Sequence, residues 1–209
     1  MFFLKNLNAT ITKRYPIVFI PGIFGSLGDD ILEGTGNFDF GFAEFIYRPI
    51  IKTLKDMGYK EGKNLFISYY NWTMRNMDSA TNYLIPTIEK AKEVTKSPKV
   101  DIVSHSMGGI VARSYAQSKL YNSDINKLIM IGTPNTGSAK AYYFWSGAEF
   151  ASDEFPKNIL YKVVRNSYMW YFKNKYKKKL NIEDIRRRFP SVEELLPDYN
   201  YGDYLFEDK

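Results

Sequence analysis

One segment, residues 100–111, restricts what this 209-residue chain can fold into more than any other, because it turns a strand directly into a helix. An apolar run ends in the sequence Ser-His-Ser-Met-Gly-Gly at 104–109, and a helical pattern starts at once at Met107. Such a sharp turn holds Ser106 in a strained backbone conformation and exposes its hydroxyl at the end of the sheet. Small residues on either side let strand and helix pass closely. We therefore predict that Ser106 is a nucleophile rather than an ordinary exposed turn serine.

A serine nucleophile of this kind needs amide N–H groups that stabilise a negatively charged oxygen. The N–H of Met107, at the positive end of the predicted helix, is one candidate. The second should lie on another loop at the same end of the sheet, and the segment 21–26 (Pro-Gly-Ile-Phe-Gly-Ser) follows an apolar run at 15–20. Ile23 directly follows the first glycine of this segment, which favours its N–H as the donor, with Phe24 as the alternative. A plain glycine-rich turn is the competing interpretation.

Apolar runs alternate with helical patterns along the first two thirds of the chain, which is typical of a parallel sheet with crossover helices. Strands are predicted at 15–20, 65–70, 99–104 and 127–131, and helices at 42–57, 79–96 and 107–120. Asp78 and Ser79 are candidate N-caps of the second helix, and Pro86 predicts a kink in it. The fold class is therefore α/β, with a mostly parallel sheet flanked by helices.

The pattern changes after residue 138. Residues 139–180 hold aromatics and lysines without strand alternation, which favours short helices, and residues 186–201 end in a proline-containing, loop-like stretch. We predict two parts: a core at 1–138 that carries the nucleophile, and a helical cap or lid at 139–209.

Four segments of the chain carry motifs of a known family: residues 16–26, residues 70–72 with Arg75 nearby, residues 104–113 and residues 131–138. In this order along the chain, they resemble the lecithin:cholesterol acyltransferase family and its bacterial lipase-like relatives. A fifth segment, at 189–197 (Phe-Pro-Ser-Val-Glu-Glu-Leu-Leu-Pro), is similar to a stretch in the cap of these enzymes. The likeness covers roughly residues 15–138 and the patch near 190.

The resemblance implies an α/β-hydrolase fold and acyl transfer from a lipid ester to water or to an alcohol. It implies Ser106 as nucleophile, with Ile23 and Met107 as the amide donors, and it implies that Trp72 lies in a strand-end loop beside the acyl pocket. It also implies an Asp and a His that follow the serine in the chain. No position in this sequence can receive that His.

The chain has a single histidine, His105, directly before the predicted nucleophile. Because neighbouring side chains diverge in a tight turn, we expect His105 to pack beside or under the turn and not to reach the Ser106 hydroxyl. Asp101, inside the preceding strand, is a poor candidate for a catalytic acid. We therefore expect a hydrolase fold that is incomplete on its C-terminal side, whose base and acid come from a complementing C-terminal fragment. The alternative is a catalytically silent module that keeps the pocket and binds a lipid or a partner.

Aromatic and basic residues gather in the predicted cap. An aromatic cluster that includes Trp145 follows the last predicted strand, where a lipase lid would contact lipid; packing over the end of the sheet is the alternative. Residues 157–188 contain eleven Lys or Arg and two acidic residues. Peripheral contact with an anionic membrane surface is one interpretation and a solvated helix face is the other. Nucleic-acid binding is not favoured, because no recognition motif accompanies the charge.

Several classes of function are excluded or disfavoured by composition. Without cysteine there is no disulfide framework and no thiol catalysis, and a single histidine leaves no metal-ligand spacing. The glycine loops do not match a phosphate-binding pattern, so no metal or cofactor is expected. No apolar run is long enough to span a bilayer, and the N-terminus is not recognised as a signal peptide. We expect a soluble, cytoplasmic protein, with the membrane-peripheral alternative open.

Overall fold

Four parallel strands form the central sheet, in the order β4-β1-β5-β6. The computed structural model describes residues 14–30, 35–147, 170, 174–175 and 182–197. Within them, β1 is Ile17–Ile20, β4 is Leu65–Ile67, β5 is Val100–His105 and β6 is Ile125–Ile131. The four predicted strands are thus present, although β4 ends before the predicted residue 70. All four residues of β1 are buried, as their continuous apolar sequence predicts for an inner strand.

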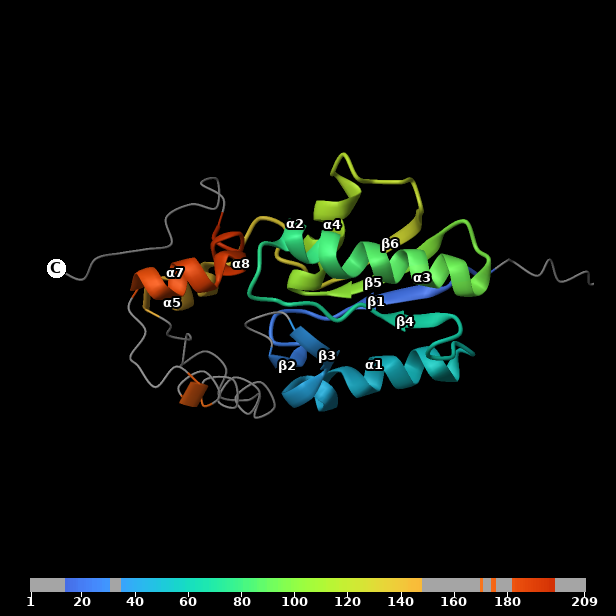
Figure 1. Ribbon diagram of the computed structural model, residues 1–209, viewed down its shortest axis with the longest axis horizontal. Coiled ribbons are helices and arrows are strands. Elements are labelled where there is room, and N and C mark those ends of the chain that lie inside the picture. The colour runs from blue at the N-terminus through green and yellow to red at the C-terminus, as the bar shows by residue number, and fades with distance from the viewer. Residues whose placement is uncertain (1–13, 31–34, 148–169, 171–173, 176–181, 198–209) are drawn as a thin grey trace, which may run out of the picture.

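Helices cover both faces of this sheet, as Figure 1 shows. On one side lies α1 (Glu44–Asp56), which follows the short turn η1 (Gly41–Ala43). On the other lie α2 (Asn76–Ser79), the π-helical turn η2 (Ala80–Leu84), α3 (Ile85–Thr95) and α4 (Met107–Ala116). The predicted α/β class, with a parallel sheet flanked by helices, is confirmed.

The helix predicted at 79–96 begins earlier than expected. It starts at Asn76, after Arg75, so Asp78 and Ser79 are inside it and the prediction that they cap it is wrong. The backbone N–H of Asn76 instead donates to the carboxylate of Glu194, at 2.7 Å. Pro86 lies inside this continuous helix, in the first turn of α3, and the helix widens to the π-helical turn η2 just before it.

A second, two-stranded sheet was not predicted. β2 (Leu27–Asp30) and β3 (Thr35–Asp39) pair antiparallel, with an irregular register between Gly28 and Asp30. The segment 27–39 is short, glycine-containing and acidic, and it lacks the alternation that marks a strand.

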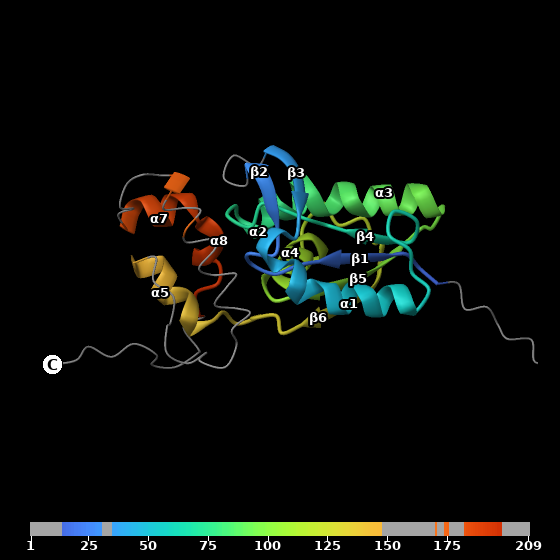
Figure 2. The same cartoon turned by 90° about the horizontal axis from the view of Figure 1, so that it is seen from below.

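Three helices gather beyond the carboxyl ends of the strands, as both views show (Figures 1 and 2). They are α5 (Ala139–Gly147), α7 (Ile182–Arg188) and α8 (Pro190–Glu193), and each contacts the other two. α5 confirms a short helix at the start of the predicted cap, and the first part of the segment 186–201 holds the end of α7 and the whole of α8. Most of the basic segment 157–188 lies outside the described residues. Of the helices described, none is long and apolar enough to cross a membrane.

Candidate active site

The turn between β5 and α4 has the strained geometry that the sequence predicts. Ser106 lies between the last residue of β5 and the first residue of α4, with φ 51° and ψ −128°. A backbone conformation of this kind costs a non-glycine residue about 1–3 kcal/mol and persists only where the surroundings enforce it. Part of that enforcement comes from β6, because the Ser106 N–H donates to the carbonyl of Ile131 at 2.9 Å.

Two glycines after Ser106 allow other segments to approach the start of α4. A side chain at Gly108 would collide with the backbone carbonyl of Pro21, at the end of β1. A side chain at Gly109 would collide with Thr133, just after β6. The position two before the nucleophile is Ser104, which is fully buried and donates its hydroxyl to the carbonyl of Ile129 at 3.2 Å. The serine is thus accommodated where a glycine would also fit.

The loop after β1 lies directly against Ser106. A Cβ placed on Gly22 would be 2.7 Å from the Cβ of Ser106, so only glycine fits there. The loop is closed by a hydrogen bond from the Gly25 N–H to the Gly22 carbonyl, at 2.9 Å, with Phe24 at φ 62°. This is the geometry of a tight turn with a left-handed third residue. Among the residues that the structure describes, no acceptor is bonded to the N–H of Ile23.

A cavity of about 310 Å³ opens at this point. Its volume lies at the lower end of the range for small-molecule sites. Ser106, the loop after β1, the segment after β6 and two helices of the predicted cap contribute to its lining, which is mainly apolar. The lining residues are Ile23, Phe24, Ser106, Gly132, Pro134, Ser138, Lys140, Ala141, Phe144, Val192 and Leu195.

Neither of the two tryptophans predicted for the acyl pocket or lid is among these described lining residues. Trp72 is fully buried behind the lining residue Phe24, with ring centroids 4.7 Å apart, and it stacks on Phe189 at 5.9 Å. Trp145 lies one residue beyond the lining residue Phe144, and the guanidinium of Arg186 lies 3.6 Å from its ring centroid. Trp72 therefore supports the wall, and Trp145 joins α5 to α7.

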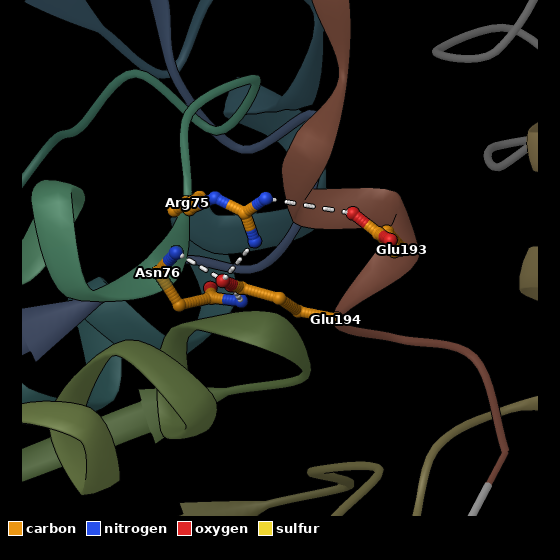
Figure 3. Close-up of polar contacts among 4 residues, drawn as sticks. All are labelled: Arg75, Asn76, Glu193 and Glu194. Atoms are coloured by element: carbon orange, nitrogen blue, oxygen red, sulfur yellow. Dashed lines mark hydrogen bonds and ion pairs between the residues drawn. The ribbon is translucent and has the colours of Figure 1, made fainter. Parts of the chain in front are cut away.

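The α8 side of the cavity is fixed to the core by polar contacts (Figure 3). The carboxylate of Glu194 accepts hydrogen bonds from the backbone N–H and the side-chain amide of Asn76, at 2.7 and 2.8 Å. The guanidinium of Arg75 lies 3.4 Å from Glu194 and 3.6 Å from Glu193. These contacts hold Val192 and Leu195 in the wall. The segment that resembles a family cap, 189–197, was the available signal for this wall.

The side chain of His105 contacts Tyr47 of α1. Its Nδ1 lies 3.0 Å from the Tyr47 hydroxyl, which also accepts the N–H of Gly22 at 2.8 Å. Burial lowers the pKa of His105 below its ordinary 6.5, and burial raises the pKa of Tyr47 to about 12. Sequence reasoning did not find Tyr47, because nothing local separates it from other apolar positions of its helix.

Asp101 lies at the other end of β5 from Ser106. Its carboxylate accepts a hydrogen bond from the side-chain amide of Asn126, at 2.6 Å. It therefore joins β5 to β6 and is remote from the candidate nucleophile. Within the described residues, no cluster of three potential metal ligands occurs.

Residues 37–202 match the family described as Lecithin:cholesterol acyltransferase. The chain belongs to this family. The match includes the nucleophile turn and the α8 wall, so the resemblance drawn from the sequence motifs is confirmed, and with it the α/β-hydrolase fold. It begins after the loop at 21–26, whose place in the site rests on its contacts with Ser106.

The lecithin:cholesterol acyltransferase relatives include a much longer protein. Over 95 residues the chain is 33% identical to "Phospholipase A(1) LCAT3" of Arabidopsis thaliana, a match that covers 44% of this chain and 21% of that protein. Two solved structures are also similar. The mature lipase BlEst2 of Bacillus licheniformis has 20% identity and a TM-score of 0.48, over 82% of this chain and 62% of that one. A chain of the Tle4-Tli4 complex has 21% identity and a TM-score of 0.42, over 87% and 30%.

Proposed function

We propose that Ser106 is the nucleophile of an acyl-transfer reaction on a lipid ester, as in a lipase or phospholipase. The observation that carries the proposal is the strained backbone of Ser106 at the strand-to-helix turn. Ser106 also adjoins a tight glycine loop and lines a mainly apolar cavity. Membership of an acyltransferase family and the likeness to a phospholipase A(1) support the substrate class. Apolar lining suits an acyl chain, because burial of each methylene contributes about 0.8 kcal/mol.

The reaction would proceed in two steps. The Ser106 Oγ attacks the ester carbonyl carbon, and its proton passes to a base. The tetrahedral oxyanion accepts hydrogen bonds from the N–H groups of Met107 and Ile23, with Phe24 as the alternative donor. The bond to the lipid alcohol then breaks, the alcohol leaves with a proton, and the acyl group stays on Ser106. Water or a second alcohol takes the acyl group in the second step.

The base and the acid would come from polypeptide outside these 209 residues, in a longer chain or a complementing fragment. The reason lies within the chain: its sole histidine is His105, and the Nδ1 of that ring is engaged by Tyr47. Loss of a member of a catalytic triad lowers the rate by about 10⁴- to 10⁶-fold. We therefore predict that these residues alone hydrolyse esters very slowly or not at all.

The predicted division into a core at 1–138 and a cap at 139–209 fits this proposal. Five cavity-lining residues from the segment 139–209 support it: Lys140, Ala141 and Phe144 of α5, Val192 of α8 and Leu195 just after α8. Trp145 and the basic segment 157–188 would bring the cavity to an anionic membrane surface, where the lipid ester resides.

A fluorophosphonate probe, which labels activated serines, tests the proposal. We expect labelling of the 209-residue chain to be weak, to rise at least 100-fold when polypeptide carrying the missing base is supplied, and to vanish in Ser106→Ala. Ser118→Ala is the matched control, because Ser118 lies just beyond the other end of α4 and its hydroxyl makes only local hydrogen bonds, to the Tyr115 carbonyl and from the Leu120 N–H. It should label like the unmodified protein.

Two outcomes would count against the mechanism. Labelling that survives Ser106→Ala would assign the chemistry to another residue. Absence of labelling in every combination, with retained binding of a fatty acid in the cavity, would favour the silent lipid-binding module, for which the engaged His105 is the supporting observation.

A further inference from the structure

The hydroxyl of Tyr47 joins the loop after β1 to the turn that carries Ser106. Tyr47 is 4% exposed, and its ring is held by stacking on Phe40, with centroids 5.0 Å apart, and by an edge contact with Phe19 at 5.6 Å. Packing therefore fixes where the hydroxyl points. It lies 2.8 Å from the backbone nitrogen of Gly22 and 3.0 Å from Nδ1 of His105.

The atoms present fix the direction of one hydrogen bond: a backbone N–H can only donate, so the Tyr47 oxygen accepts from Gly22. The bond between Tyr47 and His105 can run either way, depending on the tautomer of the imidazole. We infer that the phenol donates to Nδ1, because this direction gives the buried hydroxyl proton an acceptor. Nδ1 accepts only in a neutral ring that carries its proton on Nε2. Burial, which lowers the pKa of His105, favours this neutral ring.

Each partner of the hydroxyl directly precedes a residue of the candidate site. Gly22 is followed by Ile23, whose N–H is a proposed oxyanion donor, and His105 is followed by Ser106. The Gly22 N–H is itself engaged by Tyr47, so it is not directed at the substrate. One phenol oxygen therefore sets the position of the donor loop, residues 21–26, relative to the nucleophile turn, residues 104–109.

We propose that Tyr47 is a positioning residue for acyl transfer, which locks the donor loop against the nucleophile turn through the chain Gly22 N–H to Tyr47 O–H to His105 Nδ1. The proposal rests on the function proposed above for Ser106. It also assigns a role to His105: this histidine orients the turn and is not the base. Without the hydroxyl, a buried amide loses its acceptor and the imidazole loses its fixed tautomer.

Histidine NMR tests the lock without requiring any catalysis. Because His105 is the chain's only histidine, its ring nitrogens are observed without ambiguity in protein labelled uniformly with ¹⁵N. We expect a single tautomer with the proton on Nε2, and in Tyr47→Phe a mixed tautomer together with a shifted Gly22 amide signal. Unchanged His105 and Gly22 signals in Tyr47→Phe would overturn the lock.

Tyr115→Phe is the matched control for the loss of a buried phenol. Tyr115 is 1% exposed, and its hydroxyl donates to Asp124 at 2.8 Å and accepts the N–H of Asn122 at 3.3 Å, away from the candidate site. We expect this variant to leave the His105 signals unchanged. Signals that move equally in both variants would show a general loss of packing and would contradict a specific role for Tyr47.

The rate of fluorophosphonate labelling tests whether the lock matters for chemistry, with the complementing polypeptide present. We expect Tyr47→Phe to label Ser106 at least tenfold more slowly than Tyr115→Phe at equal folded fraction, since a misplacement of about 1 Å can cost roughly 10²-fold. The side-chain oxygen of an asparagine can take the place of Nδ1. His105→Asn should therefore label faster than His105→Leu.

Failure of the lock and failure of the proposed function give different results. A folded Tyr47→Phe that labels at the unmodified rate overturns the positioning role and leaves Ser106 as nucleophile. If the unmodified protein never labels, the function of Ser106 is refuted, and the tautomer measurement still decides whether the lock exists.

Discussion

The neighbouring strands β5 and β6 have similar apolar sequences and very different surroundings. They run parallel in continuous register from Asp101 and Lys127 onward, and both lead into the candidate site. Most of β5 is buried, whereas Ile129, Met130 and Ile131 of β6 are 49%, 38% and 41% exposed. A run such as Leu-Ile-Met-Ile is typical of a strand covered on both faces. The pattern thus identifies the strand but not what covers it.

The same contrast holds where the two strands end. The end of β5 is closed in by Gly22 and Tyr47, which lie against Ser106 and His105. The end of β6 turns at Gly132, with φ 59°, and a side chain added there would meet nothing within 4 Å. Constraints on sequence are therefore concentrated at β5, and β6 presents a comparatively open surface beside the same cavity.

Truncation of one isoleucine in each strand should give the largest difference. Ile102 in β5 is fully buried, so Ile102→Ala is expected to lower the free energy of unfolding by about 2–5 kcal/mol. Ile129→Ala, at an exposed position, should change it by about 0.5 kcal/mol or less. Urea denaturation followed by circular dichroism measures both. Equal losses would mean that β6 is as well covered in solution as β5.

Substitution of one glycine at each strand end should have a smaller effect. A Cβ at Gly108 would meet the backbone of Pro21, which cannot rotate away, so Gly108→Ala should cost about 1–3 kcal/mol. Gly132→Asn should cost well under about 1 kcal/mol, because asparagine tolerates a positive φ and the space is open. Thermal unfolding of the two variants distinguishes them, and a reversed order would refute the close packing of α4 on β1.

The sequence alone was sufficient for the features that depend on local patterns. The four strands of the central sheet, the helix α4 that follows β5 and the strained turn at Ser106 were all predicted. They follow from apolar periodicity and from small residues close together in the chain. The site was less predictable. Trp72 was predicted in a strand-end loop beside the acyl pocket; it follows β4 and packs behind Phe24, which lines the cavity. The motif does not show which of these two rings faces the cavity.

The features that the sequence did not reveal depend on contacts between distant residues. Glu194 caps the helix that starts at Asn76, across 118 positions in the chain, and so local cap signals at Asp78 and Ser79 misled. Tyr47 bonds to His105 across 58 positions. In both cases the residue type is ordinary for its element, and only the folded chain brings its polar atom to a partner.

The pH dependence of stability should give the smallest effect. It tests whether the end of β5 is more buried than the end of β6. His105 ends β5 and pairs with Ile131 of β6, yet burial of the imidazole lowers the pKa of His105 below its ordinary 6.5. As the pH falls through about 6.5, the unfolded chain therefore binds a proton before the folded chain does, and stability falls until the folded pKa is passed. His105→Asn removes this contribution, while the acidic groups titrate alike in both proteins. The unmodified chain should lose more stability than His105→Asn between about pH 7.5 and pH 5 in urea denaturation. An equal loss would place the imidazole in water, so that the end of β5 would be as open as the end of β6.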